Sequence, residues 1–227
     1  MKSLLLILCG FLFCQNIQAD NQFVVKGEMT CDSLRWSPKV IKELYLSRMV
    51  DGQMQNIDTV QVKNKKFTFK GQVPEVQEMY FITGFDNGEI QLFLDKGEIT
   101  VNPFNAQYPV AATVAGTPNN DLLTEFMGIT QSSNKKSGKR LNALIASLPK
   151  EITEDDAKFA PYHRSNFYSN NLNAKLDIIH FLNQHMDAPL ALYIIKFNMM
   201  PMFTTKVMDR QFLRALAPEL HSHPPNC

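Results

Sequence analysis

The chain has 227 residues, 44% of them hydrophobic, and carries 23 basic against 22 acidic side chains. This hydrophobic content is enough for an ordinary globular core in one or two domains. The near-neutral charge gives no electrostatic reason to expect nucleic acid or an anionic membrane as a partner.

Residues 1–19 have the pattern of a secretory signal peptide. Lys2 supplies the charged start, residues 4–14 are apolar, and the stretch from Ile17 to Ala19 is a plausible cleavage site. The apolar stretch is too short to span a bilayer. We therefore expect a periplasmic or otherwise exported protein that begins at Asp20 and has no transmembrane segment.

The four cysteines fit an exported protein without a lipid anchor. Cys9 and Cys14 each follow a bulky residue, whereas a lipoprotein anchor requires a small one there, so a lipoprotein is the less favoured reading. Cleavage of the signal leaves Cys31 and Cys227 in an oxidising compartment. They lie at opposite ends of the chain, and their pairing cannot be deduced without geometry.

Residues 20–116 show short β-rich runs separated by turn residues. In the run KKFTFKG, for example, Phe67 and Phe69 point to one face, while lysine and threonine side chains point to the other and predict a solvated surface. The runs cover residues 23–29, 42–50, 57–63, 66–73, 79–85, 89–95 and 98–103. Their spacing predicts an antiparallel β-sandwich or barrel.

Residues 117–220 are predicted to form a small antiparallel helical domain, followed by a tail at 221–227. Thr117 provides a capping hydroxyl and Pro118 a first helical residue, so a helix should begin here. The polar, basic stretch 131–140 has no periodicity and predicts a flexible connector.

A second long helix is predicted to open at a capping box in residues 153–156 and to run to about His185. Pro161 should kink or split it. Further helices are predicted from 187 to about 200 and over residues 205–216. The fold class is therefore α+β, with the β domain preceding the helices.

The order of these motifs resembles a known family. VKNKKFTFKGQVPE, MYFITGFDNGEIQLFLDKGEITV, AGTPNNDLLTEF and MDAPLALYIIKF resemble the N-terminal domain of unknown function that precedes a thioredoxin-like domain in envelope thiol-disulfide oxidoreductases. The most specific points are the phenylalanine strand with Gly71, the LDKGEITV strand and the Gly-Thr-Pro-Asn-Asn-Asp junction.

The resemblance implies a thiol-disulfide context, but this sequence has no Cys-x-x-Cys pair. The redox residues of the family therefore have no counterparts here, and none is assigned. The ending HSHPPNC stands near the point where a linker to a thioredoxin-like domain would begin. We accordingly expect either a truncated chain or a relative that lacks the catalytic half.

Several residues could bind a metal, but another interpretation is favoured for each. His221, His223 and Cys227 offer donors suited to zinc or copper, yet a solvated tail is the simpler account. His180 and His185 are five residues apart, which places them on different faces of a helix.

Four methionines, Met199, Met200, Met202 and Met208, suggest a copper(I) site, because thioethers suit soft metals. Core packing is favoured, since apolar residues flank the segment and methionine fills irregular gaps. We expect no metal or cofactor.

No catalytic constellation is apparent in the sequence. Asp155 and Asp156 could be imagined as an acid and base pair, but a helix start explains both residues. We therefore assign no catalytic, cofactor-binding or metal-binding residue.

Three functional hypotheses remain. The first is a non-catalytic module that positions, dimerises or docks a thioredoxin-like domain or another envelope protein. The second is a free-standing envelope protein that binds a ligand or a metal. The third and weakest is an enzyme that uses Cys227 as a lone redox thiol.

Overall fold

The computed structural model describes residues 21–32 and 40–199, with side chains up to Phe197. The residue contacts divide the chain into two compact units, one up to Thr124 and one from Glu125 onward. We call them the β unit and the helical unit and describe each by itself. The predicted signal peptide, the helix at 205–216 and the tail lie outside the described residues.

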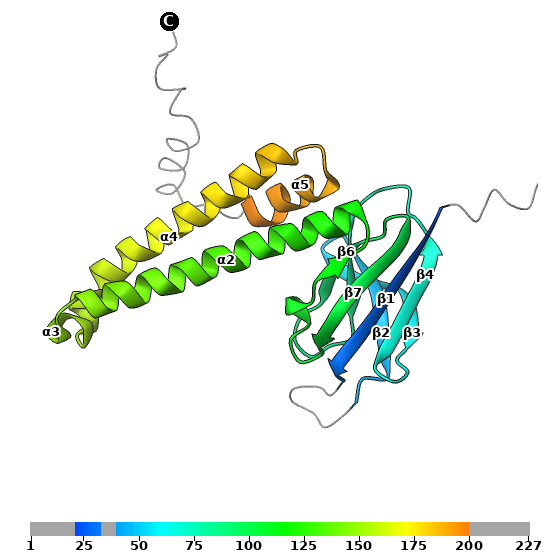
Figure 1. Cartoon of the computed structure of the whole chain (residues 1–227), viewed down its shortest axis with the longest axis horizontal. Helices are drawn as coiled ribbons and strands as arrows, with labels where there is room; N and C mark the ends of the chain where they lie inside the picture. Colours follow the sequence, from blue (N-terminus) through cyan, green and yellow to red (C-terminus); the bar gives the residue numbers. More distant parts are fainter. Residues whose placement is uncertain (1–20, 33–39, 200–227) are drawn as a thin grey trace, which may run out of the picture. The chain divides into compact units, whose positions relative to one another are not determined.

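The β unit contains eight strands in two sheets of four (Figure 1). All seven predicted strands are present, and a two-residue strand is added. The strands are β1 (Gln22–Cys31), β2 (Glu43–Val50), β3 (Gln53–Gln61), β4 (Lys66–Gln72), β5 (Met79–Thr83), β6 (Ile90–Phe93), β7 (Gly97–Asn105) and β8 (Val114–Ala115). A short 3-10 helix, η2 (Pro109–Ala111), separates β7 from β8.

The first sheet has the order β4-β1-β7-β8 and the second the order β3-β2-β5-β6. All neighbouring pairs are antiparallel except β1 and β7, which are parallel, with Val25 opposite Ile99. The sequence predicted only antiparallel pairing. The parallel pair needs a long crossover, which the whole second sheet and its connections provide.

Each sheet contributes a face of fully buried side chains to one core. Val25, Phe69 and Ile99 come from the first sheet, and Leu44 and Ile82 from the second. Because the two sheets belong to one compact unit, these faces cover one another. The architecture is thus a sandwich, and the α+β class predicted from the sequence is confirmed.

Two tight turns fix the register of the hairpins. Asp51 and Gly52 both have positive φ and join β2 to β3 in a two-residue loop. Asn64 and Lys65 do the same before β4, and the flanking Lys63 and Lys66 exchange backbone hydrogen bonds. Positive φ at both central residues matches the right-handed twist of the strands. The lysines of this second turn are exposed, as predicted.

Two glycines allow phenylalanine rings to lie flat across β1 and β4. Gly71 is opposite Phe23, and a Cβ added to Gly71 would stand 2.7 Å from Cζ of that ring. Gly27 is opposite Phe67 in the same way, and a Cβ there would also collide with the ring. This packing explains why the phenylalanine strand carries Gly71.

The helical unit is built around two long antiparallel helices that lie along each other (Figure 1). Phe126 on the first contacts Phe181 on the second, and Arg140 Nη1 donates to Asn170 Oδ1 at 3.1 Å. The elements are α2 (Pro118–Ser147), α3 (Lys150–Thr153), α4 (Asp156–Gln184), α5 (Pro189–Tyr193) and the π-helix η3 (Ile194–Met199). None of the described helices has an apolar stretch sufficient to cross a bilayer.

The flexible connector predicted at residues 131–140 is wrong, because these residues lie inside α2. Ser133 is buried and Arg140 binds Asn170 across the helix pair. Phe126, Ser133 and Arg140 are spaced by seven residues and so lie on one face of the helix. Tertiary contacts therefore stabilise a helix that the local sequence does not specify.

Pro161 does not split the second long helix, since α4 continues through it to Gln184. Proline lacks a backbone N–H, so α4 loses the hydrogen bond that residue 161 would donate to the carbonyl of Ala157, and the remaining hydrogen bonds maintain the helix. The predicted end near His185 is confirmed, because His185 is the C-terminal cap.

Candidate functional site

The Gly-Thr-Pro-Asn-Asn-Asp junction covers residues 116–121. It contains Asn120, whose side chain is completely buried. Its Oδ1 accepts from the backbone N–H of Phe93 at 2.9 Å, and its Nδ2 donates to the carbonyl of Phe93 at 2.9 Å. The same Nδ2 donates to Thr117 Oγ1 at 2.7 Å. The amide therefore pairs with the end of β6 as a neighbouring strand would.

The first turn of α2 is capped by a residue from outside the helix. Asp95, which follows β6, accepts from the backbone N–H of Asn119 at 3.2 Å and from Asn119 Nδ2 at 2.7 Å. The hydroxyl of Thr117, predicted to cap the helix, instead accepts from Asn120 Nδ2. A carboxylate at this position also interacts favourably with the positive end of the helix.

Further hydrogen bonds close the junction and connect the start of α2 to β8. The N–H of Gly116 donates to Asp121 Oδ1 at 2.9 Å. Thr124 Oγ1 accepts from the N–H of Val114 at 3.1 Å and donates to its carbonyl at 2.5 Å. Gly116 has φ +100°, and a Cβ there would stand 2.6 Å from the carbonyl oxygen of Glu98.

The polar side chains of the junction are thus engaged with the backbone of the same unit. Asn120, Asp95 and Thr124 hydrogen-bond groups that β6, β8 and the start of α2 would otherwise leave unpaired. This bonding indicates a structural role for the motif.

Tyr80 is a titratable group whose pKa departs from its ordinary value. Burial first, and then the nearby Glu78 carboxylate, raise the pKa of the Tyr80 hydroxyl, while Arg48 opposes the shift. Arg48 and Glu78 lie 3.8 Å apart. The neutral phenol is therefore favoured further, as expected for a core tyrosine with a polar tip.

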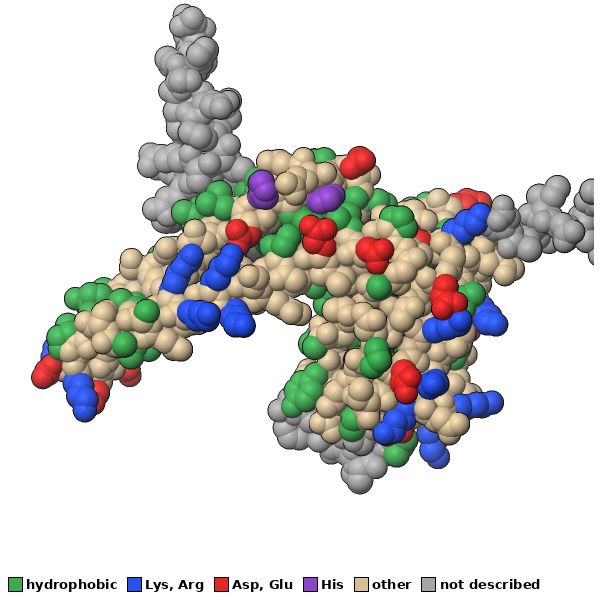
Figure 2. All heavy atoms as spheres, viewed as in Figure 1, with side chains coloured by type: hydrophobic (Ala, Val, Ile, Leu, Met, Phe, Trp, Pro, Cys, Tyr) green, Lys and Arg blue, Asp and Glu red, His purple; other side chains and the backbone are tan. Residues whose placement is uncertain are grey.

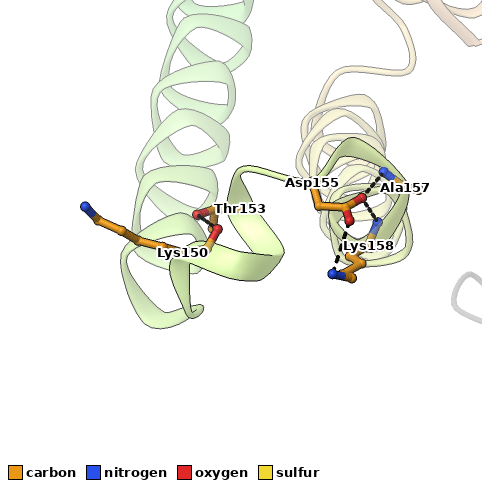
Figure 3. Close-up of polar contacts among 5 residues, drawn as sticks. All are labelled: Lys150, Thr153, Asp155, Ala157 and Lys158. Atoms are coloured by element: carbon orange, nitrogen blue, oxygen red, sulfur yellow. Dashed lines mark hydrogen bonds and ion pairs between the residues drawn. The ribbon is translucent and has the colours of Figure 1, made fainter.

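Asp155 is the N-terminal cap of α4 (Figure 3). Its Oδ1 accepts from the N–H of Ala157 at 3.0 Å and of Lys158 at 3.2 Å, and Lys158 Nζ lies 3.2 Å from Oδ2. The hydrogen bonds from Lys158 lower the pKa of Asp155. The predicted capping box at residues 153–156 is therefore wrong: the cap is Asp155, and Thr153 ends α3 with its hydroxyl donating to the carbonyl of Lys150.

Only some of the residues considered as metal ligands lie within the described residues. His185 stacks on Phe181 at 4.7 Å, whereas His180 Nε2 lies 3.3 Å from the side chain of Gln184. Over residues 21–32 and 40–199, no three His, Cys, Asp or Glu side chains gather as a metal site requires. Cys31 is half-buried. His221, His223, Cys227, Met200, Met202, Met208 and the side chain of Met199 lie outside the description.

The helical unit exposes many large apolar side chains, which the sequence analysis did not single out. Eight of the fifteen such residues in the described chain belong to it. They are Ile145, Tyr162, Phe167, Tyr168, Leu176, Met186, Leu192 and Phe197. Phe167 and Tyr168 lie at helical spacing from the buried residues Lys175 and Leu182, so periodicity alone predicts that they too are buried. The structure shows that they are not, because nothing among the described residues covers this part of α4.

One part of the helical unit has no buried residue. We call residues 134–169 the helical arm; it comprises the second half of α2, all of α3 and the first half of α4. Figure 2 shows apolar side chains near its tip and Lys and Arg side chains further along. Each side chain of the arm is exposed or only half-buried.

Comparison with known proteins gives one family match. Residues 19–123, which contain nearly all of the β unit, match the family model described as Domain of unknown function (DUF4369). The match ends within the first turns of α2 and includes the whole junction around Asn120. No curated protein and no solved structure gives a significant match to the chain.

Proposed function

We propose that this chain is a non-catalytic, exported module that positions or docks a thioredoxin-like domain or another envelope protein. The observation that carries the proposal is the exposed apolar surface of the helical unit, with Leu192 72% and Met186 60% exposed. Exposed apolar patches of this kind mark protein interaction sites.

The bonding of the junction supports the same proposal. Its polar residues, including the buried Asn120 and Asp95, are engaged with backbone and neighbouring side chains. In this proposal the domain matched by DUF4369 has a structural role, and the helical unit makes the contact.

Docking is tested with a purified thioredoxin-like domain taken from a family member that carries both domains in one chain. Calorimetric titration into this chain should show saturable binding. Leu192→Asp should weaken binding about tenfold or more, since a buried contact would acquire a charge. Val76→Asp in the β unit is the matched control, because Val76 is 69% exposed.

Absence of binding, or equal effects of the two variants, would contradict docking through the helical unit. Tight stoichiometric binding of zinc or copper(I) would instead favour a free-standing metal-binding protein.

The proposal that the chain is non-catalytic is tested separately. The chain should reduce insulin disulfides no faster than a simple thiol at equal concentration, because efficient exchange needs a second cysteine beside the attacking one. Turnover that disappears in Cys227→Ser or Cys31→Ser would contradict this part of the proposal.

Export is tested by the intact mass of the protein recovered from the envelope fraction. We expect a species that begins at Asp20 and carries no lipid. Retention of residues 1–19, or a lipid-sized increment, would contradict it.

A further inference from the structure

The loop between β5 and β6 carries the one Asn-Gly pair of the sequence, Asn87-Gly88. Both residues are exposed, and the loop residues 84–89 belong to no helix or strand. Gly88 has φ +89° and no side chain that could hinder a neighbour from approaching its backbone nitrogen. The pair therefore places the amide carbon of Asn87 next to an accessible backbone nitrogen.

Neither of these two groups is held by a hydrogen bond. Within residues 21–32 and 40–199, the backbone N–H of Gly88 and the side-chain amide of Asn87 have no hydrogen-bond partner. The junction asparagines differ, because the side-chain amides of Asn119 and Asn120 are bonded and both residues lie in α2. Without such restraints, the nitrogen of Gly88 can reach Cγ of Asn87.

Asn64 provides a comparison within the same molecule. It is exposed and lies in the tight turn before β4 with φ +51°, so it too is a turn asparagine open to solvent. Its successor is Lys65, whose side chain hinders access to the backbone nitrogen and whose carbonyl accepts from the N–H of Met29. Exposure alone therefore does not distinguish Asn64 from Asn87, whereas the residue that follows each of them does.

Contacts on both sides of Asn87 anchor the loop. The ring of Phe85 packs edge-to-face against Phe104 of β7, with the ring centroids 5.8 Å apart. Gly88 lies so close to η2 that an added Cβ would stand 2.5 Å from Cγ1 of Val110. A change in the covalent backbone at Asn87 would therefore disturb the packing of the loop against β7 or η2.

We propose that Asn87 is a site of spontaneous deamidation, with the backbone nitrogen of Gly88 as the nucleophile. This nitrogen loses its proton and forms a bond to Cγ of Asn87, while the bond from Cγ to Nδ2 breaks and ammonia leaves. The product is a cyclic succinimide. Water then adds to either of its carbonyl carbons and opens the ring to aspartate or isoaspartate. Nothing is oxidised or reduced, and water is the only co-reactant.

The modification changes both the charge and the backbone of the loop. A carboxylate replaces the neutral amide between Asp86 and Glu89, so like charges come together. In the isoaspartate form the main chain passes through the former side chain and becomes longer between the anchors at Phe85 and Gly88. We expect Gly88 to move away from Val110. This inference goes beyond the proposed function, because it needs no partner protein.

The experiment follows each asparagine of the purified full chain during incubation at neutral and at mildly alkaline pH. Peptide mapping by mass spectrometry detects deamidation, and labelling with a protein isoaspartyl methyltransferase detects isoaspartate. We expect the amide to be lost first at Asn87, and faster in alkali, where more of the attacking nitrogen is deprotonated. Asn87→Gln should abolish the label, because the longer side chain forms the ring far less readily. Asn64→Gln is the matched control and should be labelled like the wild-type protein.

Three results would overturn the proposal. They are an Asn87 amide that persists in the folded chain, amide loss that begins at Asn64 or another asparagine, and a label that survives Asn87→Gln. Hydrogen exchange tests the structural consequence, because peptides that contain Asn87 or Val110 should exchange faster in aged protein than in fresh protein. Equal exchange would show that the anchors remain in place after the reaction. The docking titration plays no part in these measurements, so the two proposals can fail separately.

Discussion

In the β unit, side chains from two sheets meet in one core, whereas the helical unit buries little beyond one end of a helix pair. Twenty-three of the thirty buried apolar residues in the described chain belong to the β unit. Ten of the eleven largest fully buried side chains lie there as well, and Phe181 is the exception. Burial of apolar side chains therefore stabilises the β unit far more than the helical arm, which contains no buried residue.

The difference also concerns polar groups. In the β unit, buried polar side chains such as Asn120 and Ser47 satisfy backbone groups or one another. In the helical arm, polar and apolar side chains alike are exposed or only half-buried.

The largest expected effect comes from Asn120→Ala in the β unit. The N–H and carbonyl of Phe93 would lose their buried partner, which should cost about 3 kcal/mol of unfolding free energy. Urea unfolding followed by hydrogen exchange of β-unit peptides measures the loss. Asn119→Ala is the control and should cost about 1 kcal/mol, because the backbone of Phe93 stays paired.

The expectation fails where Asn120→Ala lowers the unfolding free energy no more than Asn119→Ala does. That result would show that the junction does not stabilise the β unit.

Gly71→Ala should also destabilise the β unit. The new Cβ would stand 2.7 Å from the ring of Phe23, which is itself buried and can move only by disturbing the core. We expect a loss of about 1–3 kcal/mol, typical of overpacking. Thermal unfolding measures it, and unchanged stability would mean that the Phe23 ring moves aside freely.

Gly138→Ala should instead increase the stability of the helical unit. Gly138 lies within α2, and no atom stands within 4 Å of an added Cβ. Because alanine favours a helix over glycine, we expect a gain of about 1 kcal/mol. The measurement is helix content as a function of urea concentration. A loss of stability there would indicate a contact at this position within the same chain.

The smallest effect is expected for Asp155→Ala at the start of α4. Hydrogen bonds from Lys158 lower the pKa of Asp155, so its charged form favours the folded state. This contribution is present above the ordinary pKa of 3.8 and is lost as the pH falls through the lowered value. The variant should therefore show slightly less helix than the wild type at neutral pH.

Circular dichroism as a function of pH should show this difference shrinking in acid. A difference that persists at the lowest pH would mean that the charge of Asp155 does not account for the effect.

The strands were predictable because their determinants are local. Alternation in KKFTFKG determines which side of β4 carries Phe67 and Phe69, and both are buried as expected. The Asp51-Gly52 turn follows from residues that tolerate positive φ. The start of α2 at Pro118 and the end of α4 near His185 follow from equally local signals.

The errors arose where distant residues compete with local preference. Asp95, from the loop after β6, caps α2 in place of Thr117. Asp155 caps α4, because Thr153 is the last residue of α3 and its hydroxyl donates to the carbonyl of Lys150. Such choices depend on which residues meet after folding, and spacing along the chain does not contain that information.

The sequence by itself determined the α+β order of the elements, the buried faces of the strands and the main helix boundaries, because these depend on side-chain periodicity and turn chemistry. Tertiary structure decided the parallel pairing of β1 with β7 and the helical state of residues 131–140. It also decided that Asn120 completes the edge of β6 and that the arm around Ile145 stays open. Each of these depends on contacts between residues far apart in sequence, which form only when the surrounding fold brings them together.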